Sequence, residues 1–193
     1  MNWTRRGRAR SWVIGVLAVG LVVLAAGMYW FQPWKLWVDE AVHEDLALPS
    51  RTQQAEDQLP SDAPSSAVSP TPSEPRTLAT GALISHEHET SGTVRIVRLP
   101  DGALVLRLED ISTSNGPDLH VWVTDAPVKP GKDGWGVFDD GAYVSAGKLK
   151  GNKGSQNYEL PADLDLDRYS SVTIWCDRFD VSFGAAELAK NAA

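Results

Sequence analysis

Twenty consecutive residues near the N-terminus carry no charge, and this stretch constrains the chain more than any other feature. It runs from Trp12 to Phe31 and is rich in Val, Leu, Ala and aromatic residues. As a helix rising about 1.5 Å per residue it would span about 30 Å, which is the thickness of the hydrocarbon core of a bilayer. The sequence therefore predicts a transmembrane helix over residues 12–31, which would be the part of the chain that contacts lipid.

The residues on either side of this stretch predict its orientation. The preceding tail, residues 1–11, contains four arginines and no acid, so we expect it in the cytoplasm and the C-terminal part of the chain on the extracytoplasmic side. A cleaved signal peptide is the alternative. Its apolar region would end near small residues such as Ala25 and Ala26, whereas here Met28 to Phe31 continue the apolar run. We expect a retained, single-pass cell-membrane anchor.

Two segments of different composition follow the apolar stretch. Apolar residues recur at helical spacing over 32–48, which predicts a juxtamembrane helix on the membrane surface. Residues 49–76 contain six Pro and six Ser and no aromatic residue, so they cannot bury enough apolar surface to fold. We expect this linker to be disordered and to hold the next domain roughly 30 to 80 Å from the bilayer.

The remaining residues, 77–193, predict an all-β domain, an antiparallel β-sandwich. Short runs of alternating apolar and polar residues are separated by Gly, Asp and Asn, as is typical of such folds. One hairpin turns at Asp101–Gly102, and the residues expected on its inner face are Val94, Ile96, Leu104, Leu106 and Leu108, with Leu99 as a further candidate. Five more strand candidates follow: LHVWVT, AYVSAGKL, QNYEL, SVTIWCD and VSFGAAEL.

Charge and cysteine content exclude several classes of function. The net charge of -7 argues against nucleic acid as a partner, because a nucleic-acid-binding surface must neutralise phosphates. The single Cys cannot form an intramolecular disulfide or a Cys-rich zinc site. The sequence patterns of common hydrolases and dehydrogenases are also absent from the chain. We therefore make no assignment of an enzyme class.

Three long stretches of the C-terminal domain resemble one known family. They are TSNGPDLHVWV over 113–123, GKLKGNKGSQNYELP over 147–161 and SVTIWCDRFDVSFGAAEL over 171–188. Together with His88 and the following ETSG, they are similar to the DM-thirteen, or electron-transfer DM, domain. The resemblance covers about residues 79–188. It implies a β-sandwich related to the DOMON superfamily, and a redox role on secreted or membrane-anchored proteins; we expect a bacterial member.

The resemblance places the family's characteristic cysteine at Cys176, which is our redox candidate. An unpaired Cys in an oxidising compartment is open to sulfenic acid formation or mixed disulfides. This hypothesis predicts that a thiol-alkylating reagent modifies Cys176 in the native domain. The alternative is that the thiol fills the core, because strand alternation places Val172, Ile174 and Cys176 on one face.

The family's N-G-P-D turn falls on Asn115, Gly116, Pro117 and Asp118. Asn and Gly tolerate a positive φ and Pro fixes the exit of a turn, so a structural turn is expected; binding of a ligand is the alternative. The stretch Gly147–Gly154 contains three Lys and three Gly. We expect it to be a hairpin between two strands, with an anion-binding nest as the alternative.

Histidines supply the remaining candidate binding residues, His88 and His120. The cofactor is unknown from the sequence. Haem would need an iron ligand from His120, His88, His86 or Cys176. No metal ion is expected, since the alternating acids Asp163, Asp165 and Asp167 are not followed by the Gly and Glu of a calcium loop.

The sequence thus predicts a membrane-anchored, extracytoplasmic domain with a role in electron transfer or thiol redox chemistry centred on Cys176. Its partner would be an extracytoplasmic redox or envelope component. The alternative belongs to another class: a non-catalytic cell-envelope module that presents the N-G-P-D and Gly-Lys loops to a glycan or protein.

Overall fold

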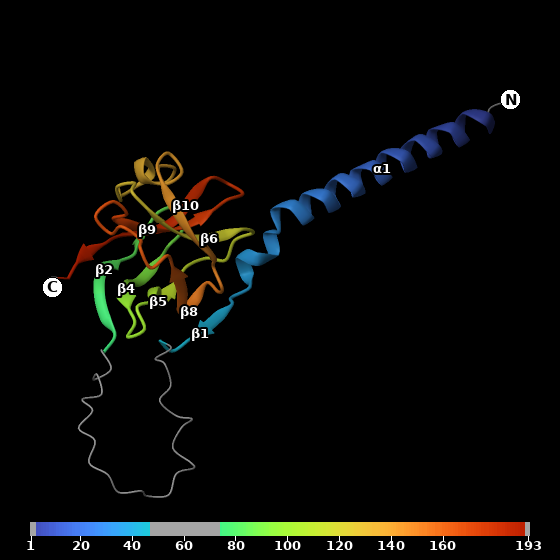
Figure 1. Ribbon diagram of the computed structural model, residues 1–193. Helices are drawn as coiled ribbons and strands as arrows, with labels where there is room; N and C mark the ends of the chain where they lie inside the picture. The colour runs from blue at the N-terminus through green and yellow to red at the C-terminus, as the bar shows by residue number, and fades with distance from the viewer. Residues whose placement is uncertain (1–2, 47–73, 192–193) are drawn as a thin grey trace, which may run out of the picture. The chain divides into compact units, whose positions relative to one another are not determined.

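The computed structural model describes residues 3–46 and 74–191 (Figure 1). The chain divides into two units, Met1–Val38 and Asp39–Ala193, which are considered separately below. Of the predicted linker 49–76, all but residues 74–76 lie outside the described residues. The disorder of the linker therefore stays a prediction.

The first unit consists of helix α1, Trp3–Phe31, and the short 3₁₀ helix η1, Pro33–Trp37. The segment Trp12–Phe31 of α1 is 20 residues long, has a mean hydropathy of 2.3 and is not buried by protein. Large apolar side chains such as Leu21 and Val22 are exposed along it. This helix is long and apolar enough to cross a bilayer, and it is a membrane anchor or a signal sequence.

The predicted juxtamembrane helix over 32–48 is wrong. Gln32 takes a left-handed conformation (φ 45°), and Pro33, which has no amide hydrogen, follows it, so α1 ends at Phe31. After η1 the chain becomes extended, and Ala41–His43 form strand β1 of the second unit. The apolar spacing that predicted a helix is instead divided between a single 3₁₀ turn and a strand.

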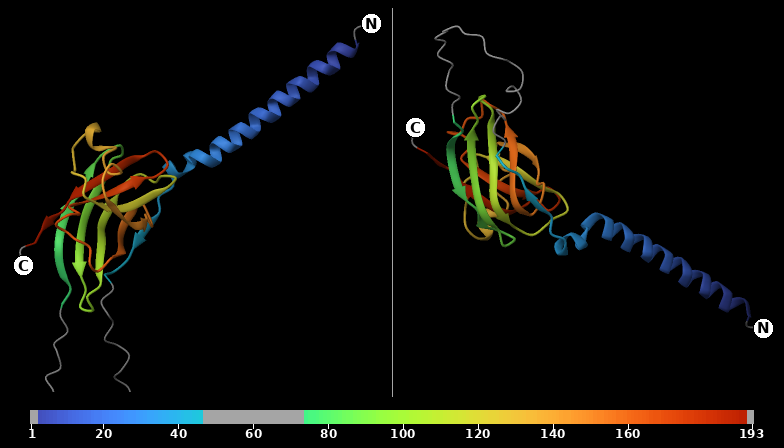
Figure 2. Two further views of the ribbon diagram at one scale, coloured as in Figure 1. Left: turned by 45° about the horizontal axis from the view of Figure 1, so that its top comes forward. Right: turned by 90° about the horizontal axis from the view of Figure 1, so that it is seen from below.

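The second unit is a sandwich of two sheets, which pack face to face (Figure 2). Sheet A has the strand order β1-β8-β5-β4-β2-β11, and sheet B has the order β3-β10-β9-β6-β7. Every pairing is antiparallel apart from β1 with β8. The remaining strands are β2 (Arg76–Ala82), β3 (Ile84–Ser85), β4 (Ser91–Arg98), β5 (Leu104–Ser112), β6 (Leu119–Thr124), β7 (Tyr143–Lys148), β8 (Lys153–Leu160), β9 (Ser171–Cys176), β10 (Val181–Glu187) and β11 (Ala189–Lys190). The all-β sandwich is thus confirmed.

The main core lies between the two sheets and follows the predicted alternation. The predicted inner face of the β4–β5 hairpin is buried there, namely Val94, Ile96, Leu104, Leu106 and Leu108. Sheet B contributes alternate residues of β6 and β9, among them Val121, Ile174 and Cys176. Leu99 differs from the other candidates, because it lies in the turn and lines a surface cavity.

A second, smaller apolar cluster covers the outer face of sheet B. Trp122 and Trp175 project from β6 and β9 and pack with Phe138 and Ala126. Phe138 and Ala126 belong to the connection between β6 and β7, which includes the 3₁₀ helix η2, Lys132–Gly134. This connection, residues 125–142, therefore forms a third layer, and both faces of sheet B are buried there.

The stretch Gly147–Gly154 does not form the predicted hairpin. It leaves β7 in sheet B and enters β8 in sheet A, so the strands it joins pair with β6 and β5 instead of with each other. Gly147 and Gly154 have positive φ values of 121° and 98°, which only Gly adopts without strain, and these allow the chain to cross between the sheets.

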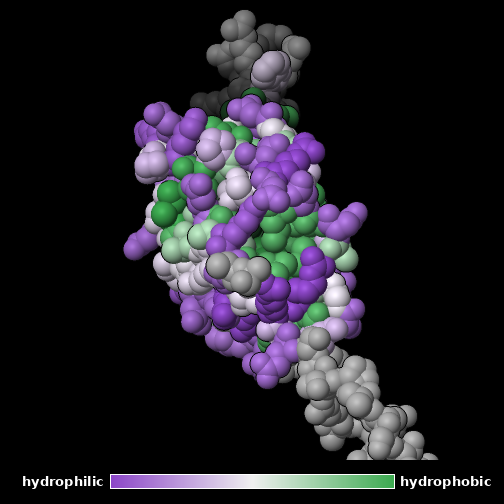
Figure 3. Space-filling model, turned by 60° about the vertical axis from the view of Figure 1, so that its left-hand side comes forward, coloured by the Kyte–Doolittle hydropathy of each residue, from purple (hydrophilic) through white to green (hydrophobic). Residues whose placement is uncertain are grey.

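The surface of the domain is mixed rather than uniformly polar. On the face drawn in Figure 3, apolar side chains are visible between strongly hydrophilic ones. Among the described residues of the domain, the large apolar side chains that stand out into solvent include Ile84, Tyr143 and Phe179. Single exposed apolar residues of this kind are normal for a soluble domain.

Candidate functional site

Pairing between β6 and β9 brings the predicted redox residue next to the predicted turn. In the antiparallel register, Leu119 lies opposite Cys176 and His120 lies opposite Trp175. Just beyond these pairs, the amide of Asp177 donates to the carbonyl of Asp118 at 3.1 Å. The structure thus gathers Cys176, Asp118 and His120 at one end of sheet B.

The thiol of Cys176 lies in the main core. Cys176 is 0% exposed. Val172 and Ile174, its neighbours on the same face of β9, are equally buried. Burial raises the pKa of the Cys176 thiol. Backbone hydrogen bonds to the sulfur from Arg178, Phe179 and Asp118 oppose this increase but do not cancel it. The thiol thus fills the core, as the alternation along β9 allowed.

This burial revises the expectation that a reagent modifies Cys176 in the native domain. Because a buried thiol with a raised pKa is a poor nucleophile, we predict alkylation at least about a hundredfold slower in the folded than in the unfolded protein. Mass spectrometry of alkylated protein, with and without denaturant, measures this ratio. Equal rates in the two states would contradict the buried position of the sulfur.

A group of charged side chains surrounds His120 on the other face of the same strands. His120 Nε2 lies 3.2 Å from Asp118 Oδ1 and 3.8 Å from Asp177 Oδ2. Lys148 Nζ donates to Asp118 Oδ1 at 2.9 Å, and this bond holds the pKa of Asp118 below its usual value, with a smaller contribution from His120. Asp177 and Lys148 were not predicted as site residues; Asp177 directly follows the candidate Cys, which is a signal that could have found it.

The three residues Asp118, His120 and Asp177 have the spacing of metal ligands. One ligand atom from each lies within 4.8 Å of the others. Carboxylates and imidazole are ligands for several divalent ions. However, the ammonium of Lys148 already compensates the charge of Asp118 at the oxygen that faces His120. The group is therefore best described as an ion-paired cluster beside the buried thiol.

The N-G-P-D turn has a clear structural role. Asn115 Oδ1 accepts a hydrogen bond from the amide of Gly116 at 2.8 Å. A Cβ at Gly116 would approach Leu119 Cδ2 to 3.0 Å and Phe183 Cζ to 3.1 Å, so a larger residue would require these core side chains to shift. Neither Asn115 nor Gly116 takes the positive φ that the sequence allowed. Of the four turn residues, Asp118 joins the cluster around His120.

The other histidines are held by contacts within the protein. The ring of His88 packs on the ring of Phe183, with centroids 4.0 Å apart. His86 is buried, with Nδ1 2.8 Å from Ser182 Oγ and Nε2 3.1 Å from the carbonyl of Lys129. To bind iron, His86 would have to give up one of these bonds. Cys176 faces the core while His120 lies on the opposite face of the sheet, so these groups do not present a common site for haem.

The stretch Gly147–Gly154, which we call the Gly-Lys stretch, contacts residues 39–44 of the same chain. Lys150 Nζ bonds to the carboxylate of Glu44, and Lys153 Nζ to that of Asp39. Both acids precede the Pro-rich linker in the sequence. Two of the three lysines of this stretch are therefore paired with Glu44 and Asp39, and the third, Lys148, is paired with Asp118.

Comparison with known families confirms the resemblance found in the sequence. Residues 82–188 match the family model described as electron transfer DM13, and Cys176, the N-G-P-D turn and all three resembling stretches lie inside the match. The chain belongs to the DM13 family. No curated protein and no solved structure matches the chain. The apolar helix and the linker lie outside the DM13 match.

Proposed function

We propose that the protein is a membrane-anchored electron-transfer protein in which Cys176 is the redox-active group. The observation that carries this proposal is that the only thiol of the chain lies within the DM13 match, at the end of β9. There its sulfur accepts hydrogen bonds from backbone amides, which favour the thiolate and oppose part of the effect of burial on its pKa. The ion-paired cluster around His120 lies at the same end of sheet B, on its opposite face.

Access to the sulfur would require opening of the turn that follows β9. Residues 177–180 form this turn, and they include the exposed Phe179 and Asp180, which has a positive φ of 49°. Turns at the ends of strands open locally at lower free energy than the whole domain. We therefore propose that the turn 177–180 regulates how often Cys176 meets a reaction partner.

The proposed chemistry is thiol–disulfide exchange with a partner disulfide. In the open state Cys176 loses its proton to water and the thiolate attacks one sulfur of the partner. A new Sγ–S bond forms, the partner's S–S bond breaks, and the leaving thiolate takes a proton from water. A second thiol then loses its proton to water and attacks the partner's sulfur in the mixed disulfide. A disulfide forms between these two sulfurs, the Sγ–S bond breaks, and Cys176 takes up a proton and is released as a thiol. The second thiol has then been oxidised to one half of a disulfide, and one sulfur of the original disulfide has been reduced to a thiol.

The proposed location follows from the apolar helix. With the N-terminal arginines in the cytoplasm, the DM13 domain would stand on the extracytoplasmic side of the membrane. Disulfide partners persist in such oxidising compartments. The location and the chemistry therefore support each other.

The test is a glutathione titration of the full-length chain in detergent micelles. Under anaerobic conditions, intact-mass measurements follow the protein across ratios of oxidised to reduced glutathione. We expect one reversible glutathione adduct whose population follows the ratio, and no adduct on the Cys176→Ser variant. A folded protein that forms no adduct at any ratio, or an adduct that forms only after unfolding, would refute the proposal.

A non-catalytic binding module is the second proposal. It is favoured by the Gly-Lys stretch, which binds an acidic segment of this chain through its lysines. A binding module should keep its partner in the Cys176→Ser variant, whereas the redox role cannot survive that substitution.

A further inference from the structure

An acidic segment from before the linker completes one edge of sheet A. Residues 39–46, which we name the strap, run alongside β8, and Ala41, Val42 and His43 pair in parallel with Lys153, Gly154 and Ser155 (Figure 1). The pairing is extended by the amide of Glu44, which donates to the carbonyl of Ser155 at 2.8 Å. The edge of β8 is therefore covered by a strand that lies outside the DM13 match.

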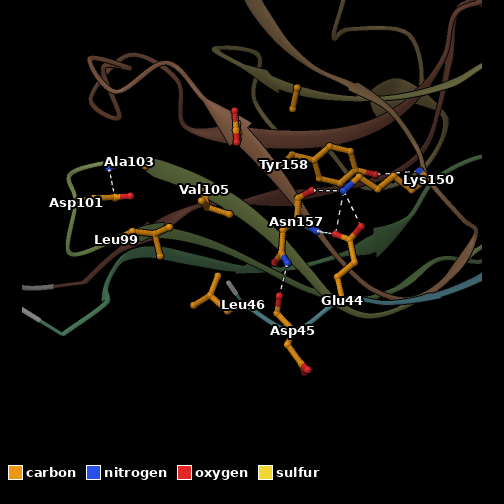
Figure 4. Close-up of a pocket in the computed structure, with 12 residues that line it drawn as sticks. Glu44, Asp45, Leu46, Leu99, Asp101, Ala103, Val105, Lys150, Asn157 and Tyr158 are labelled. Atoms are coloured by element: carbon orange, nitrogen blue, oxygen red, sulfur yellow. Dashed lines mark hydrogen bonds and ion pairs between the residues drawn. The ribbon is translucent and has the colours of Figure 1, made fainter. Parts of the chain in front are cut away.

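Charged side chains hold the two ends of the strap. At one end, Lys153 and Asn152 bond to the carboxylate of Asp39. At the other, Lys150 Nζ bonds to both carboxylate oxygens of Glu44 at 2.8 and 2.9 Å, and the amide of Asn157 donates to the same carboxylate at 2.8 Å (Figure 4). Acids of the strap thus meet lysines and amides of the domain at both ends.

The buried side chain of Asn152 forms a hydrogen bond with the backbone of the strap. Asn152 is 1% exposed, and its Oδ1 accepts the amide hydrogen of Glu40 at 2.7 Å. Its Nδ2 donates to Asp39 and to the carbonyl of Thr113. The side-chain amide of Asn152 thus forms hydrogen bonds both with the strap and with Thr113 of the domain. These bonds fix the register of the strap.

Two glycines make room for the strap backbone. A Cβ at Gly151 would collide with the carbonyl oxygen of Glu40, and a Cβ at Gly154 would collide with the carbonyl oxygen of Val42. Gly154 also has a positive φ of 98°. Any other residue at these positions would prevent the close approach of the two strands.

We infer that the edge of β8, together with the stretch Lys150–Ser155, is a binding site for an acidic peptide in the extended conformation. Its occupant is the strap of this same chain. Strand addition supplies the backbone hydrogen bonds, and the lysines and Asn152 select carboxylates at fixed spacing. This assignment does not depend on the redox role of Cys176.

The residues that flank the described ends of the linker are both held on the domain. Leu46, at the end of the strap, and Pro75, before β2, line the same surface cavity of about 320 Å³. In the sequence the linker thus joins two strands of sheet A, β1 and β2.

The first test uses charge reversal in the full-length chain in detergent micelles. We expect Lys150→Glu to increase hydrogen exchange of the Glu44 amide by about fivefold to tenfold, since it replaces an ion pair by repulsion. The double variant Glu44→Lys/Lys150→Glu should restore slow exchange. Lys190→Glu, which removes an ion pair with Asp167 elsewhere on the domain, is the matched control and should leave the amide unchanged. Unchanged exchange in Lys150→Glu would overturn the proposal.

The second test asks whether the site binds its ligand from solution. In a full-length Asp39→Lys/Glu44→Lys variant the strap should leave the site. A synthetic peptide with the natural sequence of residues 39–46 should then bind, as followed by fluorescence anisotropy of a labelled peptide. The same peptide with Glu44→Lys should bind at least about tenfold more weakly. Failure of the natural peptide to bind, or equal binding of both peptides, would refute an acidic-strand site.

Discussion

Replacement of Trp175 by Ala should lower the free energy of unfolding of the domain by about 3–5 kcal/mol. The side chain is 1% exposed on the outer face of sheet B. It stacks on Trp122 with ring centroids 5.2 Å apart. It also packs edge-on with Phe138, and the centroids of these two rings are 6.4 Å apart. Its loss would leave a cavity under the connection 125–142, which packs on this face through Phe138. Denaturation by guanidinium chloride, followed by circular dichroism, measures the change.

Tyr143→Ala is the matched control for this prediction. Tyr143 also stacks on Trp122, with centroids 3.9 Å apart, but it is 45% exposed. Its removal should therefore cost only about 1 kcal/mol. If both variants were destabilised equally, or if Trp175→Ala cost less than Tyr143→Ala, the connection 125–142 would not be a packed third layer.

Strand β9, which carries Trp175, shows how far the sequence could predict the core. Alternation in SVTIWC correctly assigned Val172, Ile174 and Cys176 to the face that packs against sheet A. It could not show that Thr173 and Trp175, on the other face, are also buried. Their cover comes from residues 125–142, a stretch rich in Gly, Asp and Lys whose local pattern indicates only a loop. Long-range packing of this kind leaves no periodic signal in the sequence.

The strap was missed for a related reason. Within the strap, only Ala41–His43 form a regular strand. Three residues are too few for an alternation of apolar and polar residues to be recognised. Their partners lie at Lys153–Ser155, on the far side of the linker in the sequence. The charges of Glu44 and Lys150 were visible in the sequence, but nothing local indicates that they pair.

The candidate site was predicted in part. Cys176, Asp118 and His120 lie at the same end of sheet B because β6 and β9 are neighbours, an arrangement that the sequence did not specify. His88 is elsewhere, against Phe183. His86 was considered only as an iron ligand, yet it is the histidine with the most extensive buried hydrogen bonds, because Ser182, which it contacts, also bonds to Thr173 at 2.8 Å.

We expect the domain to lose stability on mild acidification because of His86. Its ring accepts or donates at Ser182 Oγ and at the carbonyl of Lys129, and it stacks on Phe138. A backbone carbonyl oxygen can only accept a hydrogen bond, so Nε2 carries the hydrogen, and in the neutral ring Nδ1 accepts from Ser182 Oγ. Protonation of Nδ1 would break the bond from Ser182 and place a charge in a buried site. Burial accordingly lowers the pKa of His86 below its ordinary value.

The direction of the effect follows from proton binding in the two states. Between the lowered pKa of folded His86 and its unfolded value near 6.5, the unfolded chain binds more protons than the folded domain. The free energy of unfolding therefore falls as the pH falls below about 6.5, by up to about 1.4 kcal/mol per pH unit for one proton. Between pH 7 and pH 5 one such proton lowers the free energy of unfolding by at most about 2 kcal/mol. The acids with lowered pKa, Asp39, Glu44 and Asp118, contribute only at lower pH, near and below 4.

Guanidinium chloride unfolding at several pH values between 5 and 7.5 measures this dependence, and two glutamine variants assign it. His86→Gln should be less stable at pH 7, because its hydrogen bond with Ser182 is disturbed. Its free energy of unfolding should, however, no longer change between pH 7 and pH 5. His88→Gln should keep the pH dependence, since His88 lies in a half-buried position beside Glu87 without the buried bonds of His86. A slope that persists in His86→Gln would show that another group titrates in this range and that the bond to Ser182 does not depend on a neutral imidazole.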